Sequence, residues 1–194
     1  MIKHDNPLSN VLEAFYAARD AVRVTRRLIP ELKAKEPHCQ NEIFHQRRKL
    51  LNRTVFLSHK SAKDLLENTE EEIRDLFVLN LWVVFERFVR IYLQEIVFSF
   101  DTHQNIDFCK ALQLHFNKKV EYLNAEEVLD FLKISFFNTE GGSTLIGSAK
   151  QILKYRDWIA HKNPKKQPPV KIVPETAYDI LNEIIEVLLQ QNKV

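Results

Sequence analysis

Glycine is scarce in this chain: only three occur among 194 residues, at positions 141, 142 and 147. Folds built on many tight turns or on glycine-rich phosphate loops need more, because glycine readily adopts the positive φ of such turns. Apolar residues also recur at the three- and four-residue spacing of an amphipathic helix along nearly the whole sequence. We therefore expect an all-α protein, an antiparallel helix bundle with at most a short two- or three-stranded element.

Signals for helix starts divide the chain into helices. Asn6-Pro7 is typical of a start, since a capping side chain precedes a proline in the first turn. Asn124 and Glu127 have the spacing of a capping box, and the run TEEE at 69–72 has the same pattern at the start of a long apolar helix. The expected helices cover about residues 7–30, 41–57, 70–100, 107–115, 125–132, 143–162 and 175–191, with a continuation of the second helix over 61–66 left open.

We expect a single domain over residues 1–194, because a chain of this length can bury a core of its own. Residues 1–66 are expected to form an N-terminal helical layer, and residues 69–192 the core bundle. The clearest break is the loop NPKKQPPVKIVP that follows residue 162. The preceding helix should stop there, because the residue before a proline disfavours helical backbone.

The composition, 45% hydrophobic and 28% charged, is that of an ordinary soluble protein. The longest apolar tract, residues 76–100, carries too many charged side chains for a membrane span. The first residues contain no apolar segment of the kind that a signal peptide needs. We therefore expect a cytoplasmic protein that does not enter a membrane.

The net charge is only +2, but the charges are unevenly distributed. Lys and Arg outnumber Asp and Glu in residues 1–60 and 131–172, and the reverse holds in residues 61–130 and 173–194. The two basic segments either gather into a surface for a polyanion or pair with the acidic ones inside the fold.

Several common active sites are excluded because their motifs are missing. The sequence has no P-loop, GxGxxG, GxSxG or HExxH, and its two cysteines form no CxxC pair. Two groups with zinc-binding residue types lack the spacing of a zinc site: His38, Cys39 and His45, and His103, Cys109 and His115. We expect neither a metal nor a cofactor.

One segment, KYRDWIAHKNP at 154–164, carries the residues of a small catalytic site. Asp157 and His161 lie four residues apart on one helix face, and Arg156 lies about 140° from His161 at ~100° per residue. A guanidinium binds phosphate through two hydrogen bonds, and an imidazole exchanges a proton near neutral pH. These groups are the minimum for metal-free RNA cleavage. The opposite side of the helix is expected to face the core through Ile152, Tyr155 and Ile159.

The segment RDWIAH resembles the R-x4-6-H motif of the HEPN superfamily, small all-α proteins that include many metal-independent ribonucleases. The polar residue after the arginine, the tryptophan and the small residue before the histidine are similar to the RiboL-PSP-type branch. The resemblance implies an HEPN-like bundle with additional N-terminal helices, and a homodimer that brings two motifs into one composite site. A second match, Arg53 to His59 in RTVFLSH, lacks both the polar residue and the position at a helix end before a proline-rich loop.

The resulting hypothesis is an endoribonuclease whose products carry a 2′,3′-cyclic phosphate and a 5′-hydroxyl. His161 is the candidate general base or acid, Arg156 stabilises the transition state, and Asp157 shapes the site. Tyr155 and Asn163 flank the motif as supporting residues. The resemblance also implies a toxin or antiviral defence effector, with an antitoxin or defence-system protein as a partner. Some HEPN toxins carry a modified tyrosine at the position of Asn163, so control by that route is not expected here.

Glu86 is a further supporting candidate on the long apolar helix. It lies off the centre of the polar stripe, where an unpaired half-buried carboxylate is costly. We expect it to pair with Arg90, four residues on, or with Arg156, or else to orient His161. The polar stripe itself consists of Asn80, Arg87, Arg90 and Gln94.

Basic side chains gather at several places where a polyanion could bind. The candidates for RNA contact are Arg23, Arg26 and Arg27, which share a helical stripe with Arg19, and Lys162, Lys165 and Lys166, which flank the motif. Another cluster comprises Arg47, Arg48, Lys49 and Arg53. The alternatives are a solvated helix face and contact with an RNA backbone, and the latter gives a steep salt dependence.

The alternative function belongs to a different class, a non-catalytic HEPN-like dimer that binds RNA, a nucleotide or a protein partner. In that case Arg156 and His161 only complete the helix, because cations near a helix C-terminus stabilise it by ~0.3–1 kcal/mol.

Overall fold

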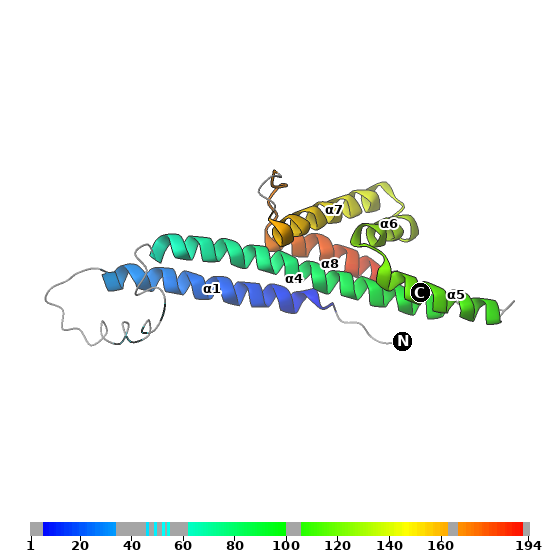
Figure 1. Ribbon diagram of the computed structural model, residues 1–194, viewed down its shortest axis with the longest axis horizontal. Helices are drawn as coiled ribbons and strands as arrows, with labels where there is room; N and C mark the ends of the chain where they lie inside the picture. Colours follow the sequence, from blue (N-terminus) through cyan, green and yellow to red (C-terminus); the bar gives the residue numbers. More distant parts are fainter. Residues whose placement is uncertain are drawn as a thin grey trace. The chain divides into compact units, whose positions relative to one another are not determined.

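The computed structural model describes residues 6–33, 46, 49, 52, 54, 62–99, 106–162 and 167–191. The elements in these ranges are α1 (Leu8–Lys33), α4 (Ala62–Ser99), α5 (Ile106–Tyr122), α6 (Ala125–Ser135), α7 (Glu140–His161) and α8 (Pro174–Gln191) (Figure 1). No strand occurs within the described residues, and the expected all-α class with a helical bundle is confirmed. None of the helices in these ranges is both long and apolar enough to cross a membrane.

The chain divides into two compact units. The first consists of Met1–Leu12 and Phe77–Val194, and the second consists of Glu13–Leu76. The first unit therefore contains the start of α1, the second part of α4, and helices α5 to α8.

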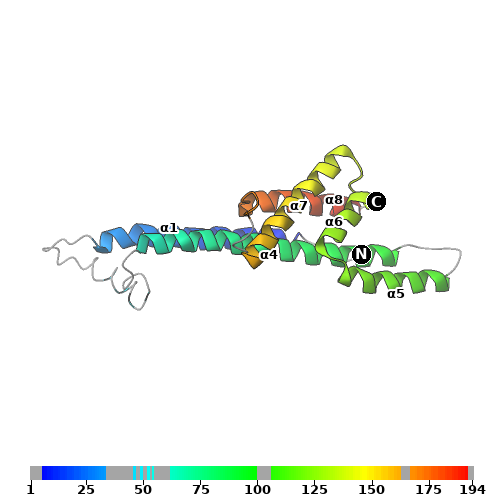
Figure 2. The same ribbon diagram turned by 45° about the horizontal axis from the view of Figure 1, so that its top comes forward.

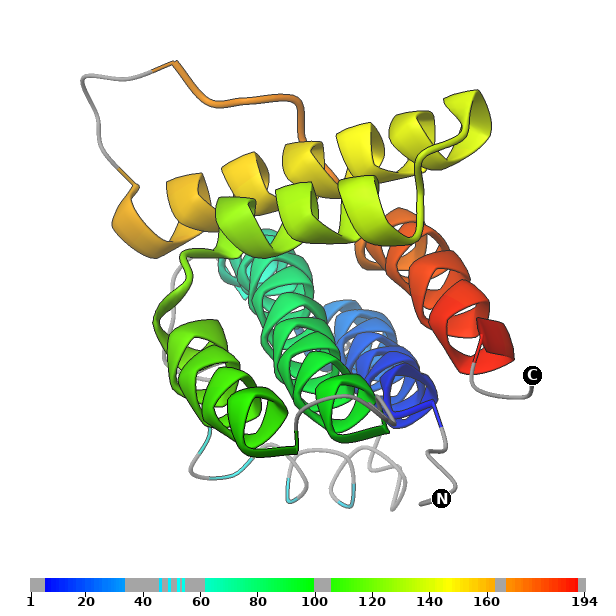
Figure 3. The same ribbon diagram turned by 90° about the vertical axis from the view of Figure 1, so that its right-hand side faces the viewer.

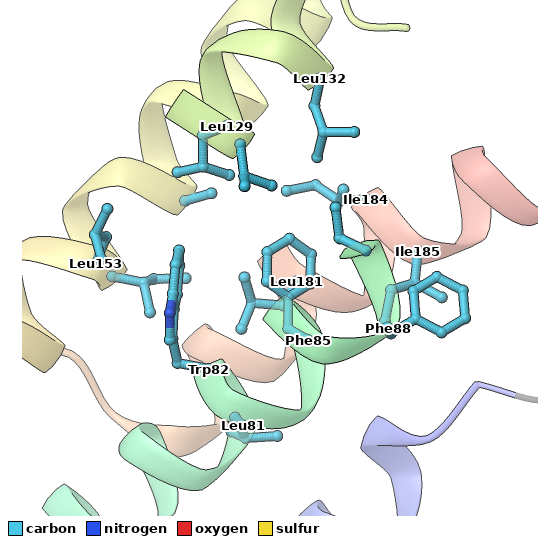
Figure 4. Packing of buried hydrophobic residues seen from close by; sticks show 14 of the residues in the cluster. Leu81, Trp82, Phe85, Phe88, Leu129, Leu132, Leu153, Leu181, Ile184 and Ile185 are labelled. Atoms are coloured by element: carbon cyan, nitrogen blue, oxygen red, sulfur yellow. The ribbon is translucent and has the colours of Figure 1, made fainter. Parts of the chain in front are cut away.

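The first unit is a bundle in which α6 packs against α7, and α7 packs against α8. Figures 2 and 3 show α6 and α7 crossing over the second part of α4. Aromatic side chains of α4, among them Trp82 and Phe85, point into the space between these helices (Figure 4). They meet leucines and isoleucines from the three other helices: Leu129, Leu132, Leu153, Leu181, Ile184 and Ile185.

The second unit is formed by the later part of α1 and the first part of α4. Val22, Ala62 and Leu66 form its small buried cluster, against which Ile73 packs. Glu70 accepts hydrogen bonds from Arg26 of α1 and, at 2.7 Å, from Arg74. This unit therefore combines a small apolar contact with an ion pair between the two helices.

Several predicted helix ends agree with the structure. The Asn6 side chain accepts a hydrogen bond from the Leu8 N–H at 3.0 Å, as a helix cap does. Asn124 and Glu127 form a complete capping box at the start of α6. Helix α7 ends at His161, and Lys162 caps it in the left-handed region, with φ 33°.

The predicted start of the long helix at residues 69–72 is wrong. Helix α4 begins at Ala62, and the Thr69 hydroxyl donates to the Leu65 carbonyl within the helix, at 2.7 Å, rather than capping it. The residues before position 69 stay helical because Ala62 and Leu66 bury their side chains against Val22. Packing therefore outweighs the local capping signal.

Other boundaries also differ from the prediction. Helix α1 continues through Pro30 to Lys33, although a proline at this position removes one backbone hydrogen bond. Helix α5 extends to Tyr122, well beyond position 115. Helix α7 begins at Glu140, and its cap is Thr139, whose hydroxyl accepts the Gly142 N–H at 3.1 Å. A Cβ at Gly142 would lie 2.9 Å from the Phe137 carbonyl oxygen, so this position requires glycine.

Tyr92 of α4 is only 1% exposed, and its hydroxyl has no hydrogen-bond partner among the described residues. Burial raises the pKa of Tyr92 to about 12. In an unfolded chain the phenol ionises near pH 10. The folded state therefore loses stability as the pH rises from about 10 towards 12, because the phenol ionises more readily in the unfolded chain.

We expect Tyr92→Phe to stabilise the fold by ~1–3 kcal/mol at pH 7, because it removes a buried hydroxyl without a partner. The gain in the free energy of unfolding should be larger at pH 11, because there ionisation of the phenol in the unfolded chain further destabilises the wild-type fold. Urea unfolding at the two pH values measures both effects. The matched control is Tyr122→Phe, since Tyr122 is 86% exposed and should show neither effect. A Tyr92→Phe variant no more stable than wild type at either pH would contradict this prediction.

Candidate functional site

The last turns of α7 carry Arg156, Asp157 and His161. On the other side of the helix, Ile152, Tyr155 and Ile159 are buried in the core, as the helical spacing predicts. This burial fixes the rotation of α7 about its axis. The three polar residues consequently lie off the buried side.

The Arg156 guanidinium is held by groups from two helices. Its Nη2 donates to Glu86 Oε2 of α4 at 3.3 Å, and its Nη1 contacts Asp157 Oδ1 at 2.8 Å. The Arg156 Cζ atom lies 5.4 Å from the centre of the Trp82 ring, within the range of a cation–π contact. The arginine side chain is 24% exposed, so its cation is partly accessible to a ligand.

Glu86 connects this arginine to the rest of α4. Its Oε2 accepts the Trp82 indole N–H at 2.8 Å, and its Oε1 accepts Arg90 Nη2 at 2.6 Å and Nε at 3.2 Å. Both expected ion pairs of Glu86, with Arg90 and with Arg156, are therefore present. The Glu86 carboxylate is half-buried, and it joins two guanidinium groups and an indole.

Arg90 departs from its expected place on the solvated polar stripe. It is buried, with 8% exposure, and its guanidinium donates to the carbonyl oxygens of Val120 and, at 2.8 Å, of Leu123. The last carbonyls of a helix have no intrahelical partner, so the C-terminal end of α5 offers acceptors that draw Arg90 inward. Sequence reasoning identified the contact with Glu86, but it did not identify these carbonyls, which lie about thirty residues away.

The charges around Arg156 are balanced. Arg90 and Arg156 contribute two positive charges, and Glu86 and Asp157 contribute two negative ones. The ion pair of Asp157 with Arg156 contributes least to stability in this group. The Asp157 side chain is 52% exposed, and exposed ion pairs contribute only ~0–1 kcal/mol. An incoming phosphate could therefore replace Asp157 at Arg156 while Glu86 continues to hold the arginine from α4.

His161 is exposed at the end of α7. Among the described residues its imidazole has no hydrogen-bond or ion-pair partner, and the expected contact in which Glu86 orients His161 is not present. Both ring nitrogens are therefore open to a hydrogen bond with a ligand. Asp157 precedes it by four residues on the same helix face.

The tryptophan of the motif belongs to the core side of the segment. Trp158 stacks on Tyr155, with ring centroids 6.1 Å apart. The Trp158 indole nitrogen is buried and has no partner among the described residues. Tyr155, expected as a supporting residue, is only 2% exposed, so its contribution is to pack α7 into the bundle.

The other candidates lie elsewhere or outside the described residues. Lys162 is exposed at the end of α7, whereas Asn163, Lys165 and Lys166 fall outside the described residues. Eight further candidates also fall outside the described residues: Arg47, Arg48, Arg53, His38, Cys39, His45, His59 and His103.

Three arginines expected to contact RNA belong to the second unit. Arg26 pairs with Glu70, and Arg23 lies 3.5 Å from Asp20. Arg27 is exposed and has no ion pair with the described residues. Pairing with an acidic segment, the second of the two expected uses of the basic segments, thus accounts for Arg26, whereas Arg23 pairs with an acidic residue of its own segment.

No group of three or more histidine, cysteine or acidic residues arranged to hold a metal ion occurs within the described ranges. Comparison of the chain with protein-family models, with curated proteins and with solved structures gave no match. The residues around Arg156 are therefore the features of the chain that point to a function.

Glu86→Ala tests whether the carboxylate holds this site together. The substitution removes the carboxylate that accepts from two guanidinium groups and an indole N–H. Loss of one partner from a buried ion pair lowers the free energy of unfolding by ~3–5 kcal/mol. We expect about 3 kcal/mol, at the lower end, because Glu86 is partly exposed. Urea unfolding measures the change.

The matched control is Glu121→Ala. Glu121 also bonds two residues of α4, Arg87 at 3.2 Å and Gln94 at 2.9 Å, but on the exposed surface. This control should lose less than about 1 kcal/mol. Equal losses for the two variants would contradict a special role for Glu86.

Proposed function

We propose that this protein is a metal-independent endoribonuclease of the HEPN type, in which Arg156 and His161 carry out the cleavage. The strongest support is the difference between the surroundings of these two side chains. The guanidinium of Arg156 is fixed by Glu86 from a second helix, whereas the imidazole of His161 is exposed and without a partner among the described residues. A fixed cation and a free proton-transfer group at the same helix end are the two kinds of group that phosphodiester transesterification requires.

In the proposed reaction the 2′-hydroxyl oxygen of the RNA attacks the adjacent phosphorus, and the bond from phosphorus to the 5′-oxygen breaks. One imidazole removes the proton of the 2′-hydroxyl, and a protonated imidazole supplies a proton to the leaving 5′-oxygen. Arg156 neutralises the charge that develops on the phosphoryl oxygens. The products carry a 2′,3′-cyclic phosphate and a 5′-hydroxyl, and no cofactor takes part.

The two proton transfers favour a homodimer. One chain offers a single histidine and a single arginine in this segment, and a second copy would supply the other proton-transfer group and another cation. We therefore propose that two copies of the α7 end face one cleft. Sedimentation at micromolar protein concentration, followed by crosslinking between single cysteines placed at position 160, would test this arrangement.

The role of the enzyme follows from the motif resemblance alone. We propose RNA as the substrate, with Lys162, Lys165 and Lys166 beside the motif as backbone contacts. A toxin or an antiviral defence effector, acting in the cytoplasm with an antitoxin or a defence-system protein as partner, is the corresponding biological setting.

One observation favours the non-catalytic alternative. The charges of Arg156 are already matched by Glu86 and Asp157, so the arginine also serves as a clamp between α7 and α4. A dimeric module that binds RNA, a nucleotide or a protein would need no more than this clamp.

Incubation of the purified protein with mixed tRNA and mRNA in EDTA distinguishes the two functions. The proposed enzyme cuts RNA in EDTA, and His161→Ala does not. A wild-type protein that binds these RNAs without cutting them would favour the non-catalytic module.

A further inference from the structure

A cavity of about 400 Å³ lies between α4, α5 and α6 in the first unit. Leu93 and Ile96 of α4, Phe116 of α5 and Phe131 of α6 form much of its wall. Figure 3 shows α5 beside the later part of α4, with α6 crossing above them. The space is partly open to solvent, and its volume is within the range of small-molecule sites, which are mostly apolar clefts or cavities of ~300–1,000 Å³.

Aromatic contacts support the wall of the cavity without any ligand. The rings of Phe116 and Phe131 lie 5.7 Å apart, and Phe136 meets Tyr92 edge-on at 6.0 Å. Such pairs stabilise a defined ring geometry beyond the burial of their area. The cavity is therefore pre-formed, which lowers the entropic cost of binding.

The chemistry of the wall restricts the ligand. Every wall side chain except that of Ser135 is a hydrocarbon, and the surface that lines the cavity is almost entirely apolar. A charged ligand would lose its hydration without gaining a counter-charge from these residues. An apolar cavity of about 150 Å³ accepts benzene, so this larger space fits a molecule of two or three rings.

We propose that this cavity is a binding site for an uncharged, mainly apolar molecule of two or three aromatic rings. The residues of the wall differ from those around Arg156, so the site is independent of RNA cleavage. Its test requires no catalytic activity.

The neutral probe N-phenyl-1-naphthylamine tests the proposal by fluorescence titration of the full chain. We expect saturable binding of one probe per chain, with emission shifted to the blue. The sulfonated analogue 1-anilinonaphthalene-8-sulfonate has nearly the same rings but carries a charge, and we expect it to bind at least ten-fold more weakly.

Two tryptophan substitutions on α5 locate the binding. Leu112 lines the cavity and is 55% exposed, so Leu112→Trp should narrow its opening without disturbing the core. Leu114 is 64% exposed and does not line the cavity. We expect Leu112→Trp to weaken binding of the neutral probe at least ten-fold, and Leu114→Trp to change it less than two-fold.

Three results would overturn the proposal. The first is the lack of saturable binding by the neutral probe, which would mean that the space is closed in solution. The second is equal weakening by the two tryptophan variants, which would indicate a general apolar surface. The third is equal or tighter binding of the sulfonated analogue.

Discussion

His161→Ala is expected to lower the rate of RNA cleavage by ~10²–10⁴-fold, the usual contribution of a positioned side chain to proton transfer. The substitution should leave the fold intact, because the imidazole is exposed and has no hydrogen-bond or ion-pair partner among the described residues. Single-turnover cleavage in EDTA measures the rate, and urea unfolding checks stability.

The matched control is His115→Ala, which removes another exposed histidine from a helix of the same unit. His59→Ala is a second control, because it belongs to the weaker motif match from Arg53. Both should remain within a few-fold of wild type. If His161→Ala cuts RNA as fast as wild type, the assignment of the segment at 154–164 is wrong.

Arg156→Ala is expected to lower cleavage by ~10²–10³-fold, a loss typical for removal of a preorganised group that stabilises transition-state charge. Arg156→Lys should recover little of this loss. A lysine ammonium lacks the planar fork with which Arg156 reaches Glu86 and Asp157 on separate nitrogens. The single-turnover rate constant and the RNA affinity should be measured separately, because a purely structural role would not lower the rate constant of the folded protein.

The result expected for Arg156 is a fall in the rate constant with RNA affinity changed much less. A clamp without a catalytic role would give the opposite pattern, a loss of stability with no change in rate for the fraction that remains folded. Arg53→Ala should affect neither quantity.

Local signals in the sequence predicted those features of the fold that are set within a few residues. The capping box of Asn124 and Glu127 and the end of α7 near Lys162 are of this kind. The buried side of α7 also followed from spacing alone, because the core selects residues at helical intervals. These features place Arg156 and His161 at the end of one helix.

Features that depend on distant contacts were not predictable in the same way. Thr69 has the sequence of a cap, yet α4 extends to Ala62 because residues of α1 cover that segment. Arg90 has the position of a solvated residue, yet it turns inward to carbonyls at the end of α5. The cavity requires three helices at once, and no sequence pattern in one of them reveals it.

The contacts of Glu86 illustrate both situations. Its pairing with Arg90 has the four-residue spacing that the sequence displays. Its pairing with Arg156 spans seventy residues, and the sequence offers it only as one of several alternatives for a half-buried carboxylate. In the structure one carboxylate holds both Arg90 and Arg156.

The most direct measurement of the central claim is the chemical nature of the RNA ends produced in EDTA. A 5′-labelled RNA cut by the wild-type protein should yield fragments that end in a 2′,3′-cyclic phosphate, with a 5′-hydroxyl on the downstream fragment. His161→Ala should yield neither under the same conditions. Fragments that end in a 3′-hydroxyl and a 5′-phosphate, or cyclic ends produced equally by His161→Ala, would contradict the proposed role of His161 and Arg156.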